Sequence, residues 1–474
     1  MTTATTPRVR FLSSAAVRGV VGEAKRILAE VGVRVEYAGA VELLAGAGAV
    51  PGEDGRIRLF PGLVDRSLAT VPREIVLYDR DGENPLRLGA GALAFAPGSA
   101  ALHVHEPATG RLRPAVREDC RRFAHLTELL PALALQSTCV VPNDEPVEHQ
   151  DRARLREALV HCRKPIVTGT FAARSFPVMA RMLECVRGGP EGLRAKPLAI
   201  FDCCPTAPLA WSELTCGALA GSAERGIPAE LISMPMTGAT APVTLIGAVV
   251  QHAAESLSGV VIHQLAGPGA PLVWGACASA FDMRLGTAPL AAVETLMIDC
   301  AAAEVGRHLG LPTHAYFTVS DAKILDAQCG AESGFGAALA ALAGFDVISG
   351  PGLLELGNCQ SLEKLVLDHE LCRQAHRLAA GIALHPENSL SGILRDGLAA
   401  GRFLDLEHTL RHHRSELHRP GPTVDRQVAG AWLASGAPTA AQRARAEVER
   451  LLAAEGAPPL AAEVEAELDR LVEA

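Results

Sequence analysis

The pattern that most restricts the fold of this chain is an alternation of short apolar runs with amphipathic segments. Most of the runs follow a segment whose apolar residues recur at three- and four-residue intervals, which is typical of a helix. Eight such runs alternating with helices predict a (β/α)8 TIM barrel of the α/β class. The runs lie at residues 133–141, 165–170, 198–203, 230–234, 260–264, 272–275, 313–319 and 346–349.

One connection does not fit a regular barrel. Only residues 265–271 separate the fifth run from the sixth, which is too short for the crossover helix that joins parallel strands. The sequence leaves two alternatives: either one of these runs is not a barrel strand, or the barrel is irregular at this point.

The chain outside the predicted barrel divides into two further regions. Residues 1–116 are expected to form an N-terminal α+β region packed on the barrel. Residues 117–418 are expected to form the barrel itself. A Pro/Gly break at residues 419–422 precedes two amphipathic segments, so residues 419–474 are expected to form a C-terminal helical hairpin.

Composition excludes several classes of protein. The 474 residues include 44 Lys+Arg and 53 Asp+Glu, and the resulting net charge of −9 argues against nucleic acid as a partner. No apolar run reaches the roughly 18 residues of a membrane span, and the N-terminus lacks the apolar core of a signal peptide. We therefore expect a cytoplasmic protein without a membrane partner. No phosphate-binding glycine motif occurs, so no bound nucleotide is expected either.

The densest polar cluster follows the seventh apolar run. It comprises Asp321, Lys323, Asp326, Gln328 and Glu332. Catalytic groups of a barrel lie on the loops after the strands, and a carboxylate, an amide and a lysine there could orient a substrate and move protons. Asp321 could instead cap the next helix, whereas Gln328 and Glu332 would share one helical face. We predict that these five residues are catalytic.

Five of the twelve cysteines fall at or just after predicted strand ends. They are Cys203, Cys204, Cys277, Cys329 and Cys359. Zinc needs about four ligands drawn together in space, but no CxxC pair occurs in the chain. Adjacent residues of a strand point to opposite sides, so at most one of Cys203 and Cys204 should face the barrel interior. We therefore predict no bound metal.

Several longer motifs resemble the trimethylamine methyltransferase family, and they follow the family's order along nearly the whole chain. The motifs are Ala96-Pro97-Gly98, residues 234–244 (MPMTGATAPVT), Asp282-Met283-Arg284, residues 320–328 (SDAKILDAQ) and residues 363–368 (EKLVLD). The resemblance implies a TIM barrel that moves a methyl group from a methylated amine to the cobalt of a corrinoid (cobalamin). A separate corrinoid-binding protein would carry this cofactor.

The resemblance also suggests the kind of amine. Archaeal members use pyrrolysine, whereas residues 316–319 of this chain are ordinary, which implies the non-pyrrolysine branch and quaternary amines such as glycine betaine. Such a substrate needs a positioned N-methyl group and a stabilised cation. From strand-end positions and aromatic character, we expect the substrate to contact Met236, Gln264, Phe281, Tyr316, Phe317 and Glu355.

Two other functions stay open on the sequence. Where relatives commonly show Asn-Pro, this chain has Asp202-Cys203-Cys204-Pro205, and only 4% of its residues are aromatic. A thiol-rich barrel mouth could serve zinc-dependent methyl transfer from or to a thiol. The same barrel could also be a binding protein without catalysis. The sequence leaves the oligomeric state open, including a homo-oligomer.

Overall fold

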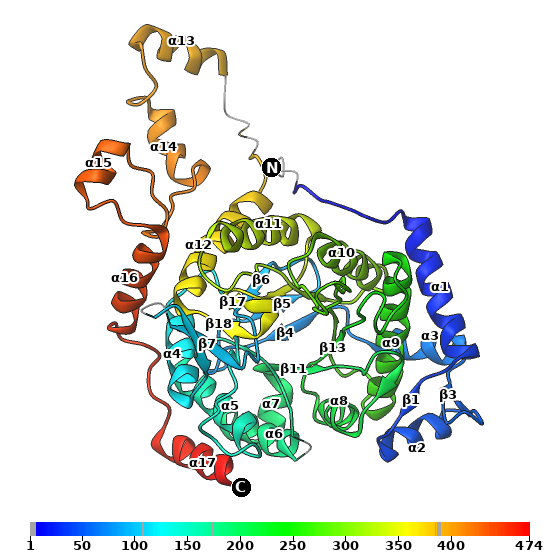
Figure 1. Ribbon diagram of the computed structural model, residues 1–474. Helices are drawn as coiled ribbons and strands as arrows, with labels where there is room; N and C mark the ends of the chain where they lie inside the picture. Colours follow the sequence, from blue (N-terminus) through cyan, green and yellow to red (C-terminus); the bar gives the residue numbers. More distant parts are fainter. Residues whose placement is uncertain (1–5, 107–108, 173, 384, 386–389) are drawn as a thin grey trace.

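The computed structural model describes residues 6–106, 109–172, 174–383, 385 and 390–474, and at its centre is a sheet of eight parallel strands (Figure 1). Parallel bridges from Phe95 to Leu133 and from Ala101 to Val140 join the two outermost strands, so the sheet closes into a barrel. In spatial order the strands are β6 (Ala94–Ala96), β16 (Val347–Ser349), β15 (Thr313–Tyr316), β14 (Leu272–Ala276), β13 (Ala229–Ser233), β11 (Ala199–Cys203), β10 (Ile166–Gly169) and β9 (Gln136–Ser137).

Each barrel strand is followed by a helix that covers the outside of the sheet (Figure 1). In chain order, the helices that follow the eight strands are α4 (Arg117–Glu128), α5 (Gln150–His161), α6 (Ser175–Val186) with the short α7 (Pro190–Ala195), α8 (Glu213–Arg225), α9 (Leu245–Ala266), α10 (Val293–His308), α11 (Ala327–Ala343) and α12 (Leu362–Ala379). The predicted (β/α)8 barrel is therefore confirmed.

The prediction was wrong about which run supplies one of the strands. Residues 260–264 belong to α9, and the remaining strand is β6, from the segment expected to form a separate N-terminal region. α9 packs between the barrel and the helices around it and is buried on nearly all sides, so its residues show no polar face that would mark a helix. The division at residue 116 stays a prediction, although one barrel strand precedes it.

α9 is also the one described helix that is long and apolar enough to cross a membrane by length and composition. However, 78% of its most apolar window is buried inside the fold. This burial is typical of a helix in the core of a fold.

The N-terminal elements cover the barrel wall and its lower end, where the strands begin. Helices α1 (Ser14–Glu30), α2 (Ala38–Gly46) and α3 (Pro61–Thr70) pack on α9. The hairpin of β4 (Ile75–Leu77) and β5 (Leu86–Leu88) places apolar side chains in one cluster with the inward residues Val167, Ile200, Val273 and Val347. It therefore closes the lower end of the barrel. Shorter strands β1 (Arg34–Val35), β2 (Val50–Pro51), β3 (Ile57–Arg58) and β12 (Ala210–Trp211) pair beside these helices.

A small sheet stands at the opposite end, where β6 and β16 finish. Its strands, in spatial order, are β17 (Leu353–Leu354), β18 (Cys359–Gln360), β7 (His103–Glu106) and β8 (Arg111–Pro114). The 3-10 turn η1 (Glu355–Gly357) joins β17 to β18. The segments that follow β6 and β16 therefore form part of the barrel mouth.

The last part of the chain leaves the barrel and returns to it (Figure 1). Helices α13 (Leu390–Ala400), α14 (Glu407–Glu416) and α15 (Ala429–Ala434) project from the barrel, whereas α16 (Ala440–Leu452) and α17 (Ala462–Glu473) lie on its wall. α16 packs on α4 and α12, and α17 packs on α5 and α6. Both expected helices form, but each docks on its own pair of barrel helices instead of pairing as a hairpin.

Candidate functional site

Two acidic residues and one histidine lie inside the barrel, above the apolar cluster that closes its lower end. Asp202 follows the inward residue Ile200 by two positions in β11, so it faces the same side of its strand. Glu230 of β13 is its register partner, and its carboxyl group is hydrogen-bonded to Nδ1 of His314 from β15. The three side chains therefore form one polar layer within the barrel.

Gly275 of β14 leaves the space that this layer needs. It pairs with His314 on one side, and a Cβ atom built on it would overlap the carboxyl oxygen of Glu230. Any larger residue at this position would push Glu230 away from His314. The absence of a side chain at Gly275 is therefore part of the site's construction.

Burial shifts the protonation of all three groups toward their uncharged forms. Burial raises the pKa of Asp202 well above its usual value, and the neighbouring Glu230 raises it further. Burial also raises the pKa of Glu230 and lowers the pKa of His314 to about 4. No lysine or arginine of the described residues forms an ion pair with either carboxyl group, and the charges of His314 and Arg154 offset only part of the rise in the pKa of Asp202.

Several polar atoms in this layer have no hydrogen-bond partner in the described structure. They are Oδ1 of Asp202, Oε2 of Glu230 and Nε2 of His314. Buried polar groups in folded proteins are nearly always paired, so unpaired groups that line one interior indicate a place for a ligand.

Residues above the layer connect it to the mouth of the barrel. Asp202, Cys204, Cys277 and Tyr316 retain some solvent-accessible surface, whereas Glu230 and His314 are fully buried. The hydroxyl group of Tyr316 is hydrogen-bonded to Oγ of Ser99 at 2.9 Å. The site is thus open toward the carboxyl ends of the strands, where barrel enzymes place their chemistry.

A buried ion pair supports one wall of this opening. Lys364 of α12 is fully buried, is paired with Asp368 and donates to the carbonyl oxygen of Thr318 at 3.1 Å. Asp368 also accepts the N–H of Gly352 at 2.8 Å. Thr318 has a φ of 61°, a left-handed conformation that costs free energy for a β-branched residue. The pair holds the strained end of β15 beside the loop that follows β16.

The five residues predicted as catalytic lie after β15, on the mouth side of the barrel, but they bond mainly to one another. Glu332 accepts from Ser320 Oγ at 2.6 Å and from the N–H of Asp321 at 2.9 Å, and Gln328 donates to its other oxygen. Lys323 donates to the carbonyl oxygen of Asp321. This network fixes the loop, and among the described residues no hydrogen bond or ion pair joins any of the five to Asp202, Glu230 or His314.

The sequence also allowed Asp321 to cap the helix that follows this loop, and the structure shows a different cap. Asp326, not Asp321, is the N-cap of α11 and accepts the N–H of Cys329 at 3.0 Å. Asp321 instead accepts the N–H groups of Leu290 and Ala291, which ties this loop to the loop that follows β14. A catalytic role for the five residues therefore stays a prediction, and their contacts point to a structural one.

The residues predicted to contact the substrate lie in different parts of the barrel, and only some of them are near its mouth. Tyr316 lies in the opening above the layer, and Met236 and Phe281 lie on half-buried loops after β13 and β14. Glu355 lies farther out, in η1. Phe317 points outward, with its ring 5.0 Å from that of Phe345 in the helix-facing core, because neighbouring strand residues face opposite sides.

Gln264 lies at the wrong end of the barrel for a substrate contact. It is in the last turn of α9, before β14 begins, and it bonds to Thr70, Gly269 and Ala270. These contacts hold the turn below the strands. The error follows directly from interpreting residues 260–264 as a strand.

The five cysteines noted in the sequence separate into three places. Cys203 packs among the outer core, and Cys329 and Cys359 share a small apolar cluster below the rim. Only Cys204 and Cys277 lie near the polar layer. Among the described residues, no group of three or more His, Cys, Asp and Glu side chains is arranged to hold a metal ion.

Glu230 and His314 were not predicted as site residues. Glu230 is the first residue of the fourth apolar run and His314 the second residue of the seventh, and both runs were interpreted only as buried strands. A charged or titratable residue inside such a run is itself a signal, because a fully buried strand position seldom holds one without a purpose. Asp202 was noted only as part of the segment Asp202-Cys203-Cys204-Pro205 and was not assigned a role.

Exposed apolar side chains surround the mouth on loops that follow five barrel strands. They are Val147, Phe171, Met234, Val243, Met283, Leu285 and Ile324, and we call this set the apolar rim. The guanidinium of Arg154 lies 4.7 Å from the ring centre of Phe171, which fixes that residue in place. Exposed apolar groups gathered at one end of a protein are typical of an interaction site.

Comparison with known proteins places these features in a family. The sequence profile of the trimethylamine methyltransferase (MTTB) family matches residues 1–474. Trimethylamine methyltransferase MttB of Desulfitobacterium hafniense is 30% identical over 430 residues, which is 90% of this chain and 86% of that protein. The glycine betaine methyltransferase of D. hafniense is 26% identical over 94% of this chain and 93% of its own length. MttB2 of Methanosarcina mazei is 37% identical over 268 residues, covering 56% of this chain and 53% of that protein.

Proposed function

Because this chain belongs to the trimethylamine methyltransferase family, we propose that it takes a methyl group from a methylated amine and passes it to a corrinoid protein. We propose a quaternary ammonium, such as a betaine, as the substrate class. A quaternary nitrogen leaves as a neutral amine when it loses a methyl group, so it needs no covalent attachment to the protein. The corrinoid would supply the cobalt that accepts the methyl group.

The observation that carries the proposal is the polar layer of Asp202, Glu230 and His314. It contains two carboxyl groups without an arginine or lysine partner among the described residues. A quaternary ammonium group entering the barrel would supply a positive charge to these carboxyl groups. An opposite charge within about 4 to 6 Å favours the ionised form of a carboxyl group, so the cation and the carboxylates would stabilise each other.

The residues around the polar layer favour binding of the ammonium cation by carboxyl groups over binding by aromatic rings. Of the aromatic candidates from the sequence, Tyr316 lies in the opening and is half-buried, whereas Phe317 faces the outer core. A full aromatic cage would need rings on several sides of the cation. We therefore propose that Asp202 binds the ammonium group, with Tyr316 forming one wall and Glu230 and His314 supporting Asp202 from below.

The apolar rim is the surface that we propose for the corrinoid protein. A flat cofactor carried by another protein must reach the mouth, so the two proteins have to meet around it. Charged substitutions Met283→Glu and Leu285→Glu should weaken complex formation and methyl transfer to the protein-bound corrinoid. Val50→Glu, on β2 beside the N-terminal helices, is a matched control because Val50 is 58% exposed, close to the 60% of Met283, and lies outside the rim.

Self-association and a cytoplasmic location are further parts of the proposal. Helices α13 to α15 carry exposed apolar residues, among them Leu394, Leu398 and Leu410, that the described chain leaves uncovered. A second copy of the chain could cover them, and light scattering of the purified protein would give its mass directly.

The proposed function is tested by offering the protein a panel of substrates. The panel should include trimethylamine, glycine betaine, other betaines and a methylated thiol, each with cob(I)alamin and with a cognate corrinoid protein. Formation of methylcobalamin from a quaternary amine, followed by absorbance, is the expected result. Turnover of the methylated thiol alone would favour thiol chemistry, and turnover of no compound under either condition would favour a binding protein.

A further inference from the structure

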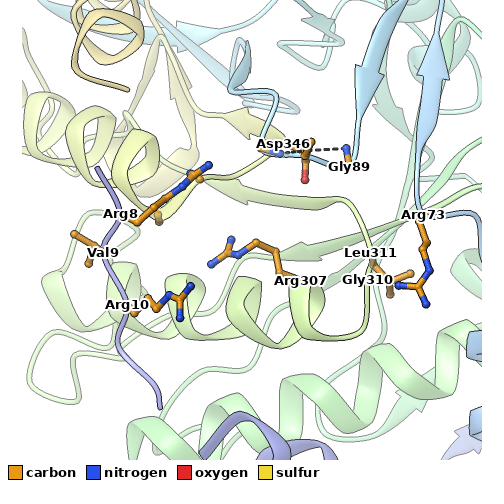
Figure 2. Close-up of a pocket in the computed structure, with 13 residues that line it drawn as sticks. Arg8, Val9, Arg10, Arg73, Gly89, Arg307, Gly310, Leu311 and Asp346 are labelled. Atoms are coloured by element: carbon orange, nitrogen blue, oxygen red, sulfur yellow. Dashed lines mark hydrogen bonds between the residues drawn. The ribbon is translucent and has the colours of Figure 1, made fainter. Parts of the chain in front are cut away.

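A second concave site lies at the opposite end of the barrel from the polar layer. It has a volume of about 430 Å³, and its lining includes Arg8, Arg10, Arg73 and Arg307 (Figure 2). Gly89 precedes β6, Gly310 precedes β15 and Asp346 precedes β16, so this pocket belongs to the end where the strands begin. It is separate from the mouth where methyl transfer is proposed.

The arginines of this pocket are not ion-paired to any acidic side chain that the structure describes. In the part of the chain that the structure describes, no ion pair or side-chain hydrogen bond involves Arg8, Arg10, Arg73 or Arg307. Nη1 of Arg307 is buried and lacks any partner. Figure 2 shows the guanidinium groups of Arg8, Arg10 and Arg307 gathered on one side of the pocket and Arg73 beside Gly310 on the other.

Glycines make room for two of these side chains. A Cβ atom on Gly344 would overlap the guanidinium of Arg8, and one on Gly310 would overlap that of Arg73. Both glycines have positive φ, 74° and 77°, so the backbone turns there favour glycine as well. The two guanidinium groups therefore lie against bare backbone at the edges of the pocket.

The acidic groups nearby are already used by backbone N–H groups. Asp346 accepts from the N–H groups of Gly89 at 2.7 Å, Gly91 at 2.8 Å and Thr313 at 2.9 Å. Glu304 accepts from Phe11 and Leu12. Four guanidinium groups thus face two carboxylates whose oxygens are already hydrogen-bonded, which leaves a net positive field. Burial, together with the charge of Arg8, lowers the pKa of Arg307, although neighbouring acidic groups act in the opposite sense.

We propose that this pocket binds a small phosphate-bearing anion with two or more negative charges. Guanidinium groups offer forked pairs of N–H donors that match phosphate oxygens, and several of them can share one ligand. The volume of about 430 Å³ is within the range of small-molecule sites. The anion would relieve the repulsion among the arginines, which come from separate parts of the chain.

The position of the arginines defines what binding would do. Arg8 and Arg10 lie on the extended segment before α1, Arg307 lies on α10, and Arg73 lies just before β4. Otherwise this segment is held by hydrogen bonds: the N–H of Val9 donates to the carbonyl oxygen of Leu342, and two further N–H groups donate to Glu304. A bound anion would therefore fix the N-terminal segment to the base of the barrel, independently of the methyl-transfer site.

Calorimetric titration of the full chain with inorganic phosphate, pyrophosphate and citrate, at constant ionic strength, tests the proposal. We expect pyrophosphate to bind most tightly, and Arg307→Gln and Arg8→Gln each to weaken its binding at least tenfold. Arg18→Gln removes the same charge from an exposed arginine of α1 that has no ion pair among the described residues, and it should leave binding unchanged.

Other outcomes would overturn the proposal. These are no binding of pyrophosphate, tighter binding of citrate than of pyrophosphate, or equal weakening by Arg18→Gln. The pocket variants should fold, because these side chains have no ion pair or side-chain hydrogen bond to lose among the described residues. Their melting temperatures without added anion provide this check, and a double variant Arg10→Gln/Arg73→Gln offers an independent test of the same pocket.

Discussion

The carboxyl group of Glu230 and the imidazole of His314 are hydrogen-bonded inside the barrel, although β14 lies between the strands that carry them. The contact is possible because β14 has a glycine at position 275. Asp202, on the other side of Glu230, completes a layer in which the acidic groups are buried without an ion pair to lysine or arginine among the described residues. This arrangement is unfavourable without a ligand and favourable around a cation.

Binding of a quaternary amine should release protons. Burial raises the pKa of Asp202 and of Glu230, so the empty site favours protonated carboxyl groups. A bound cation lowers these pKa values, and the released protons are taken up by the buffer. Calorimetry near pH 7 in two buffers of different ionisation enthalpy should give different binding heats. Equal heats in both buffers, or equally tight binding of an uncharged tert-butyl isostere, would contradict this expectation.

Gly275→Ala should damage the site while leaving the barrel folded. The added Cβ overlaps the carboxyl oxygen of Glu230, so Glu230 must move away from His314. Overpacking of a tight interior typically costs about 1 to 3 kcal/mol of unfolding free energy. We expect that loss in urea denaturation, together with a large fall in methyl transfer. Gly330→Ala on α11 is a suitable control, because a Cβ there meets no atom within 4 Å.

Removing Lys364 should destabilise the protein strongly. Lys364 is fully buried and paired with Asp368, so Lys364→Met leaves an unpaired buried carboxyl group. Breaking such a pair from one side costs about 3 to 5 kcal/mol. The double variant Lys364→Met/Asp368→Leu should be less destabilised than the single one in urea denaturation. An additive or larger loss in the double variant would show that the charge left behind is not the cause.

Titration of Asp299 should lower the free energy of unfolding as the pH rises. Burial raises the pKa of Asp299 to about 8 from its ordinary value of 3.8, so between these values the folded state holds a proton that the unfolded state releases. Its contribution is complete below pH 3.8, declines as the pH rises and levels off above about pH 8. The free energy of unfolding of Asp299→Asn should therefore fall less between pH 5 and 8 than that of the wild type. Parallel curves for the two proteins would reject this assignment.

The strands of the barrel could be predicted because parallel strands are buried on both faces and appear as apolar runs. The same property misplaced residues 260–264, since a helix enclosed on all sides is as apolar as a strand. β6, with only Ala94 to Ala96 in the ladder, is too short to be distinguished from the N-terminal strands around it. Which run completes the barrel is decided by tertiary packing.

The site was harder to predict than the fold for a related reason. The cluster from Asp321 to Glu332 is dense in polar residues because its members hold a loop together, and a sequence does not separate that purpose from catalysis. Glu230 and His314 lie within apolar runs and are 84 residues apart, so only the closing of the barrel brings them into contact. Tyr316 was predicted as a substrate contact, and alternation along β15 explains why Tyr316, and not Phe317, faces inward.

The central claim is that Asp202 binds the cation from which the methyl group is taken. The most direct test is the rate of methylcobalamin formation from the preferred quaternary amine by the wild type, Asp202→Asn and Glu332→Gln. We predict that Asp202→Asn lowers the rate at least 100-fold with an unchanged melting temperature, while Glu332→Gln keeps most of its activity per folded molecule. An undiminished rate in Asp202→Asn, with loss of activity in folded Glu332→Gln, would contradict the account and move the chemistry to the loop after β15.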